Sequence, residues 1–353
     1  MPDWTKSMTQ TYEYCLVDPV SWLDESKIDC ILPGTTINRD SSLETLGSAS
    51  IPTIERLDEC YVRIYLVTIQ NGIMERTPLG TFLVQTPEES FDGKVSSITL
   101  DGYTPLIELK EKLMPIGYSL NKGENVMDSA YLIAKSNMRA PVISASNNDK
   151  LTAAFVANTD DTCLSYERDL CANSKFELGL DSLSRLIYKP VRSIAALNPV
   201  WTYNDDNSSI LEPDVEFTRD LYGIPNVVEV VCSTTKTTYY ARAVNNKRSS
   251  PISTINRGRE VVYRETSPSL IGNPTKAEVD EYAEQLLESL SNVELSVSYT
   301  HGYCPVKLGD CVMLNYQRAG LTGIKARVVS QTITCESGCS VSEKAVFTQN
   351  MWR

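Results

Sequence analysis

Short segments with period-two alternation, separated by turn residues, are the feature that most constrains this fold. In the segment 61–69, which is rich in aromatic and β-branched residues, Val62, Ile64 and Leu66 share one face, as is typical of a β-strand with one buried face. The pair Asn71-Gly72 follows directly and favours a tight hairpin turn. Further strands are predicted up to residue 100. A closed antiparallel barrel buries such a series economically, so residues 1–102 are predicted to form one.

The pattern changes from period two to helical spacing after Gly102. Thr104 is predicted to cap a helix that ends at Pro115, with Glu108 and Lys112 paired four residues apart. A second helix is predicted at 124–136, where apolar residues recur at helical spacing. Short strands at 175–180 and 186–189 follow. Residues 103–200 are therefore predicted to form a small α+β insertion domain.

Strand patterns return after residue 200, and residues 201–353 are predicted to form a second barrel. The polar stretch 245–274 is predicted to be a long loop, which is typical of an interaction segment. Thr275 and Glu278 form a capping-box pattern, and one helix is predicted at 275–291. The predicted fold class is α+β, mostly β, with two antiparallel barrels around the insertion domain.

A faint internal repeat supports two related β units. Leu79-Gly80 and Leu308-Gly309 each precede an apolar strand in the same arrangement. The repeat is short, and chance is an alternative explanation for it.

The charge and the apolar pattern exclude several classes of protein. Lys and Arg number 33 against 45 Asp and Glu, which gives a net charge of −12 in 353 residues and argues against a nucleic-acid backbone as the main partner. No apolar run approaches the ~18 residues that cross a bilayer, and the first residues lack a signal-peptide pattern. Ten cysteines in such a chain indicate mostly reduced thiols.

Histidine chemistry is restricted to one position, because His301 is the only histidine. His301 could act as a base toward the thiol of Cys304. A spacing of three places the two side chains on opposite faces of a strand, so we interpret the pair as part of a turn. No phosphate-binding glycine motif and no nucleophile elbow is present. We expect no enzyme activity, although the many carboxylates permit a glycosidase dyad.

Two patterns in the sequence are candidates for metal sites. Four thiols in the last fifty residues, Cys304, Cys311, Cys335 and Cys339, are enough for tetrahedral zinc, but their spacings are wider than the usual two-residue knuckle. Cys335 and Cys339 could instead form a disulfide across a hairpin in oxidising surroundings. A calcium-loop pattern comprises Asp205, Asn207, Ser209 and Glu216, but Ile210 replaces the required glycine. We expect no metal and no cofactor.

An ordered series of short segments spans nearly the whole chain and resembles the central hub proteins of bacteriophage tails. These segments are Tyr12-Glu13-Tyr14, Ile37-Asn38-Arg39-Asp40, Arg63-Ile64-Tyr65, Pro78-Leu79-Gly80-Thr81-Phe82-Leu83, Val200-Trp201-Thr202-Tyr203, Tyr222-Gly223-Ile224-Pro225-Asn226-Val227-Val228 and Pro305-Val306-Lys307-Leu308-Gly309-Asp310-Cys311-Val312. The chain departs from that family in its cysteine content. It also departs between Asp149 and Lys175, where the family has a longer helical stretch.

The resemblance implies a homotrimer in which each chain supplies two tube-like barrels. Three chains would form a ring of six barrels that stacks on a sixfold tail tube and offers threefold symmetry to a spike or tip. The implied partners are the tail tube or distal tail protein ring, the tape measure protein and the spike or tail-tip protein. The implied location is the tail tip or baseplate of the virion, after assembly in the host cytoplasm.

The charge adds a hypothesis about the channel of such a ring. Three copies would carry 3 × −12 = −36, and an acidic wall would let phage DNA pass without binding. The alternative function is a β-rich carbohydrate-binding adhesin or baseplate module that uses exposed aromatic side chains. The oligomeric state and glycan binding would distinguish the two.

Overall fold

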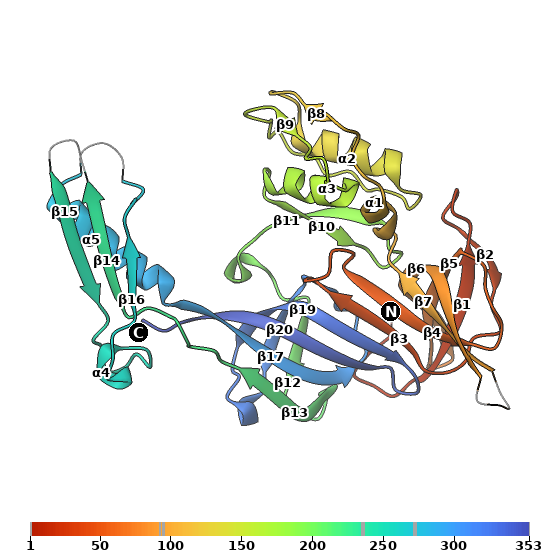
Figure 1. Ribbon diagram of the computed structural model, residues 1–353. Coiled ribbons are helices and arrows are strands. Elements are labelled where there is room, and N and C mark those ends of the chain that lie inside the picture. The colour runs from red at the N-terminus through yellow and green to blue at the C-terminus, as the bar shows by residue number, and fades with distance from the viewer. Residues whose placement is uncertain (1, 92, 94–95, 234–236, 271–273, 353) are drawn as a thin grey trace. The chain divides into compact units, whose positions relative to one another are not determined.

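The computed structural model describes residues 2–91, 93, 96–233, 237–270 and 274–352 (Figure 1). The chain divides into two compact units. The first unit consists of Met1–Val215 and Ser298–Lys344, and the second consists of Glu216–Val297 and Ala345–Arg353. Within the described ranges, no helix is long and apolar enough to cross a membrane.

Most of the regular structure is extended. The strands are β1 (Thr9–Val17), β2 (Asp24–Lys27), β3 (Thr35–Asp40), β4 (Gly47–Thr53), β5 (Cys60–Gln70), β6 (Ile73–Phe91), β7 (Ser96–Tyr103), β8 (Ser119–Leu120), β9 (Phe155–Val156), β10 (Phe176–Leu180), β11 (Leu186–Pro190), β12 (Trp201–Asn204), β13 (Leu211–Thr218), β14 (Val227–Ser233), β15 (Thr238–Val244), β16 (Val262–Glu265), β17 (Asn292–Gly302), β18 (Cys311–Asn315), β19 (Ile324–Cys335) and β20 (Ser340–Asn350). The helices are α1 (Ile107–Glu111), α2 (Val126–Asn137), α3 (Cys163–Ala172), α4 (Thr254–Arg257) and α5 (Lys276–Leu290), with short 3-10 turns η1 (Ile194–Ala196) and η2 (Gln317–Ala319). The predicted class, α+β and mostly β, is confirmed.

One sheet joins the two sets of strands that were predicted as barrels. Its order is β13-β17-β20-β19-β3-β4-β7-β6-β5-β1-β2, and β18 pairs with both β12 and β19. The junction is the antiparallel pair β3 and β19, in which Ile37 lies opposite Ile333. β19 can serve both sets because its first residues pair with β18 and its last residues pair with β3. The two sets are therefore not separate sheets.

β5 is buried on both of its faces, although its alternation predicted one buried face. Val62, Ile64 and Leu66 are fully buried on one face. On the other face, Tyr61 packs into the core of the insertion domain, and Arg63 is almost fully buried. The Arg63 guanidinium donates to Asp24 at 2.8 Å, to the carbonyl of Trp22 at 3.1 Å and to Thr81 at 2.8 Å. These bonds make the buried charge tolerable.

The insertion domain packs around an apolar core built from α2, α3 and residues around them, together with Val17, Trp22, Tyr61 and Leu83 from the first strand set. Figure 1 shows α2 and α3 together above the β10–β11 hairpin. α2 and the β10–β11 pair confirm the predicted helix and strands. α3 was not predicted. It begins with a capping box in which Thr162 accepts from the backbone of Ser165 at 3.0 Å. Its buried apolar stripe includes Leu164, Leu170 and Cys171, so the sequence held a helical signal that the prediction missed.

The predicted helix after Gly102 is shorter than expected. α1 spans only Ile107–Glu111, and the Thr104 hydroxyl donates to the carbonyl of Thr45 instead of capping the helix. Glu108 does not pair with Lys112. Its carboxylate accepts from the backbone N–H of Arg139 at 2.6 Å and contacts the Arg139 guanidinium. Glu108 therefore pairs with Arg139, which lies outside its helix, and not with the predicted partner Lys112.

Residues 216–297, which were predicted as part of the second barrel, belong to a unit of their own. A sheet of order β15-β14-β16 packs against α5, which confirms the predicted helix. The stretch 245–274 is not a plain loop, because it contains α4 and β16. The buried Asn226 orders it: its side chain donates to the carbonyls of Ile252 and Arg259, each at 3.0 Å, and accepts from the N–H of Val261 at 2.8 Å.

Candidate functional site

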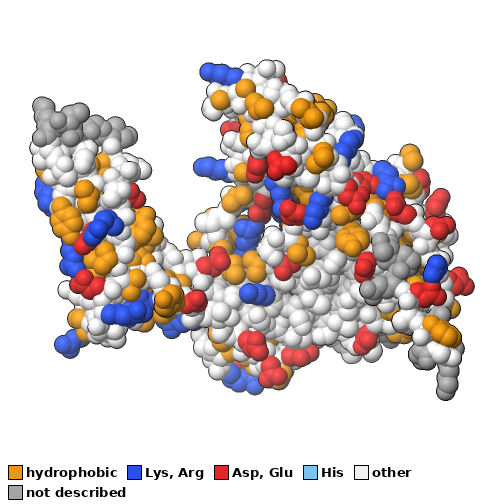
Figure 2. Space-filling model, viewed as in Figure 1, with side chains coloured by type: hydrophobic (Ala, Val, Ile, Leu, Met, Phe, Trp, Pro, Cys, Tyr) orange, Lys and Arg blue, Asp and Glu red, His pale blue; other side chains and the backbone are white. Residues whose placement is uncertain are grey.

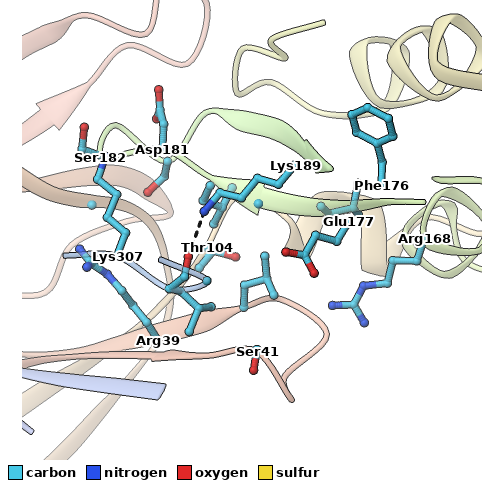
Figure 3. Close-up of a pocket in the computed structure, with 18 of the residues that line it drawn as sticks. Arg39, Ser41, Thr104, Arg168, Phe176, Glu177, Asp181, Ser182, Lys189 and Lys307 are labelled. Atoms are coloured by element: carbon cyan, nitrogen blue, oxygen red, sulfur yellow. Dashed lines mark hydrogen bonds between the residues drawn. The ribbon is translucent and has the colours of Figure 1, made fainter. Parts of the chain in front are cut away.

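A cavity of about 580 Å³ lies within the first unit, between the strands β3 and β6 and the hairpin β10–β11 (Figure 3). This volume is in the range of roughly 300–1,000 Å³ that is usual for ligand sites. Both Leu-Gly pairs of the faint sequence repeat, Leu79-Gly80 and Leu308-Gly309, contribute to its wall. Residues far apart in the chain therefore form one site.

The hairpin β10–β11 directs polar side chains into the cavity. Glu177 and Lys189 are directly opposite each other in its antiparallel register. Gly179 leaves room for the Lys189 side chain, because a Cβ at Gly179 would lie 3.1 Å from Lys189 Cε. The turn between the strands is held by Asp181, which accepts from the backbone N–H groups of Leu183 and Arg185, each at 2.9 Å.

The lining of the cavity is basic, although the chain is acidic. Two of its lining residues, Glu177 and Asp181, are acidic, and the six basic ones are Arg39, Arg168, Lys175, Lys189, Lys307 and Arg327. The formal charge of the lining is thus 6 − 2 = +4, in a chain of net charge −12. The cations come from β3, α3, β11, β19 and two loops. Tertiary structure alone concentrates this charge.

Three of the six cations, Arg39, Arg168 and Lys189, donate to uncharged groups. Lys189 Nζ donates to the carbonyl of Leu308 at 2.9 Å, as the dashed line in Figure 3 shows. Arg168 donates to the carbonyls of Leu43 at 3.2 Å and Glu44 at 2.7 Å. Arg327 forms an ion pair with Glu177. Lys175 and Lys307 make no side-chain hydrogen bond or ion pair with any described residue.

Burial disfavours the charge of two of these cations, Lys189 and Arg168. Burial lowers the pKa of Lys189, and Lys307 and Arg327 act in the same direction, while Asp310 and Glu177 oppose the shift. Burial likewise lowers the pKa of Arg168. The site therefore holds cationic groups that would gain from an anion nearby.

A second polar cluster lies deeper in the first unit, around His301. The Tyr203 hydroxyl is 3.0 Å from His301 Nε2 and 3.3 Å from Cys304 Sγ. Glu343 Oε2 is 3.5 Å from His301 Nε2, and Tyr299 donates to the same carboxylate. These side chains are almost completely buried. The cluster joins β12, β17 and β20.

The sequence argument that separated His301 from Cys304 was wrong. β17 ends at Gly302, so Cys304 lies beyond the strand, and the rule of opposite faces does not apply to it. Cys304 Sγ is 3.9 Å from His301 Nδ1, whose N–H donates to the carbonyl of Gly302 at 2.7 Å. Burial acts to lower the pKa of His301, but contacts with Cys304 and Glu343 outweigh it and raise this pKa to about 10. Because the side chains of His301, Cys304 and Glu343 are all buried, we interpret His301 and Glu343 as a structural ion pair and assign no catalytic role to His301 and Cys304.

The two polar regions are connected. Gln331 Nε2 donates to Glu343 at 2.6 Å and to the carbonyl of Val306 at 3.2 Å, and Gln331 Oε1 accepts from Arg39 at 3.1 Å. Arg39 also donates to the carbonyl of Leu79 at 2.5 Å, at the wall of the cavity. Arg39 thus ties the cavity to the buried cluster.

The metal-site candidates do not converge. Cys304 belongs to the His301 cluster, Cys311 contacts only a neighbouring carbonyl, and Cys335 and Cys339 lie at the β19–β20 turn as free thiols. Burial raises the pKa of Cys335, and burial raises that of Cys339 to about 11, so both thiols are protonated at neutral pH. No group of three or more His, Cys, Asp or Glu side chains in the described part of the chain could hold a metal ion.

Asp205, the first residue of the calcium-loop pattern, has a basic partner within the chain. The Asp205 carboxylate accepts from Arg318 Nε at 2.9 and 3.0 Å. Hydrogen bonding from Arg318 lowers the pKa of Asp205. Its charge is therefore neutralised by an arginine rather than directed toward a cation.

Comparison with known proteins identifies the fold. No model of a protein family and no curated protein matches this sequence. The solved structure of a tail protein from Neisseria meningitidis MC58 matches with a TM-score of 0.62 and 13% identity, over 97% of this chain and 98% of that one. The 43 kDa tail protein of prophage MuSo2 from Shewanella oneidensis matches with a TM-score of 0.59 and 12% identity, over 96% and 98%. This chain has a tail-protein fold. The matched range includes both β-strand sets and the insertion domain.

Proposed function

We propose that the chain is a structural component of a phage or phage-derived tail, and that it acts there as a trimeric hub without enzyme activity. The observation that carries the proposal is the full-length match to two tail proteins, which covers 96% or more of this chain in both cases. Nearly every segment thus has a counterpart in a tail protein. The burial of the single histidine supports the non-enzymatic role.

The arrangement of strands supports the hub geometry. Each chain has one set of strands on either side of the β3–β19 junction. Three chains in a ring would present six such sets to a sixfold tail tube and three identical surfaces to a threefold tip. The proposed partners are the tube or distal tail ring, the tape measure protein and a spike or tip protein.

The proposed ring would surround the channel through which phage DNA passes. Its total charge of 3 × −12 = −36 favours passage of DNA without binding. On the face seen in Figure 2, however, acidic and basic side chains are interspersed. We therefore expect the acidic channel wall to be formed by surfaces that come together only in the assembled ring. A channel lined mainly by Lys and Arg would contradict this expectation.

Light scattering coupled to size-exclusion chromatography tests the proposal. We expect a mass three times that of one chain at micromolar concentration. Particle averages viewed down the axis should show six similar densities around a pore, repeating in pairs. A stable monomer that binds a glycan would contradict the hub and favour the carbohydrate-binding module.

A further inference from the structure

We propose that the basic cavity binds an acidic segment of a partner protein, one that carries at least two carboxylates and an apolar side chain. The proposal concerns the first unit alone and does not depend on a trimer or on the DNA channel. A result that contradicts this proposal would therefore leave the proposed function unaffected, and the reverse also holds.

The first argument is charge. The lining carries a formal +4, and its two acidic residues already have basic partners: Glu177 pairs with Arg327, and Asp181 pairs with Arg185 outside the cavity. Lys189 and Arg168 donate hydrogen bonds only to carbonyl groups, and burial lowers the pKa of both although carboxylates of Asp310, Glu177 and Glu44 act on them. An entering carboxylate would replace these weak contacts with charge-assisted hydrogen bonds.

The second argument is the placement of the cations. Lys175 follows α3, Lys189 lies on β11, and Lys307 lies in the loop before β18. Figure 3 shows Lys189 and Lys307 extending from different elements, with Arg168 pointing toward Glu177. Cations distributed in this way favour a ligand with several separated carboxylates over a single ion.

The third argument is the apolar part of the wall. Leu79, Phe82, Phe176, Leu178 and Leu308 contribute to it, and the volume of about 580 Å³ is far larger than one inorganic anion requires. An apolar side chain on the ligand would cover this surface and gain from the removal of water. Carboxylates together with an apolar side chain are the chemistry of an acidic peptide.

The chain itself supplies a suitable probe peptide. Residues 211–218, Leu-Glu-Pro-Asp-Val-Glu-Phe-Thr, contain three carboxylates and a phenylalanine. This peptide, labelled with a fluorophore, would be titrated with the full-length protein and followed by fluorescence anisotropy. A matched peptide with Gln and Asn in place of Glu and Asp tests the role of charge.

We expect the acidic peptide to bind, its affinity to fall as salt is raised, and the neutral peptide to bind at least about tenfold more weakly. The double variant Lys175→Glu/Lys307→Glu should weaken binding by at least about tenfold. Neither lysine side chain makes a hydrogen bond or an ion pair with a described residue, although the charge of Lys307 acts on the nearby carboxylate of Asp310. Circular dichroism would confirm that the variant is folded.

The control is Lys122→Glu/Lys150→Glu, which changes the net charge equally at two exposed lysines outside the cavity. Its affinity should equal that of the unmodified protein. Equal binding of the neutral peptide, an equal loss in the control variant, or inorganic phosphate displacing the peptide at similar concentration would each overturn the proposal.

Discussion

Glu167 is a carboxyl group held in the core of the insertion domain. The residue is completely buried, and Tyr188 donates to its Oε1 at 2.6 Å. Its Oε2 has no hydrogen-bond partner among the described residues. Burial raises the pKa of Glu167 to about 8, although the bond from Tyr188 acts in the opposite direction. The side chain is therefore mostly protonated at neutral pH.

This raised pKa predicts that stability falls as the pH rises from about 4.5 to about 8. In that interval the unfolded chain releases the proton of Glu167, while the folded chain retains it. Glu167→Gln keeps the shape and the acceptor for Tyr188 but removes the ionisation. We expect the variant to be more stable than the unmodified protein by roughly 2–4 kcal/mol at pH 8, with little difference at pH 4.5, in urea unfolding. An equal difference at both pH values would contradict the assignment.

The His301–Glu343 pair predicts a further fall in stability, of the same sign, at higher pH. The folded pKa of His301, about 10, lies above its ordinary value of 6.5. The stability that the pair contributes is therefore fully present below pH 6.5 and is lost as the pH rises through about 10. Glu343→Gln removes the buried carboxylate, and we expect a loss of roughly 3–5 kcal/mol at pH 6.5.

The measurement is urea unfolding at pH 6.5 and pH 10. The destabilisation by Glu343→Gln should be clearly smaller at pH 10 than at pH 6.5. Glu111→Gln, at an exposed position of the same unit, is the control and should change little at either pH. If Glu343→Gln destabilised the protein equally at both pH values, His301 would not be charged in the folded protein.

Among the elements, α5 determines whether the second unit has a core. Val279, Ala283 and Leu287 are buried against Val228 and neighbouring residues of β14 and β15. Thr275 and Glu278 form a complete capping box at its start. Truncation of Leu287 would leave a cavity beneath the only long helix described in this unit.

We expect Leu287→Ala to destabilise the second unit by roughly 2–5 kcal/mol. Trp352 packs on this core and provides a local fluorescence signal. The unfolding midpoint of the second unit, followed by the fluorescence of Trp352, should shift in Leu287→Ala. It should remain unchanged in Glu284→Ala, which alters an exposed position of the same helix. A shift of the same size in both variants would show that the apolar face of α5 does not stabilise the unit.

The elements also show what could be predicted from local pattern. α5 and α2 combined a capping residue with an apolar stripe, and both were predicted almost to their ends. The order in residues 245–274 was missed because it depends on a buried amide, Asn226, whose bonds reach residues 26 to 35 positions later. No local period encodes such contacts.

For the whole molecule, period-two alternation was enough to predict a mostly β chain with a helical insertion. It could not predict that β3 and β19 would join the two strand sets, because nearly three hundred residues separate them. The cavity was missed for a similar reason. Lys175, Lys189 and Lys307 share no motif, and only the folded chain places them around one space.

The β3–β19 junction also sets the order in which the molecule can be completed during synthesis. β3 leaves the ribosome well before its partner β19 (Ile324–Cys335), which follows nearly all of the second unit in the chain. Until then one edge of β3 has no native partner, and an open strand edge invites pairing with other nascent chains. If translation stopped before Ile324, the released chain would expose an unpaired edge of β3 that can pair with other chains. Chaperones or proteases would have to remove such a chain.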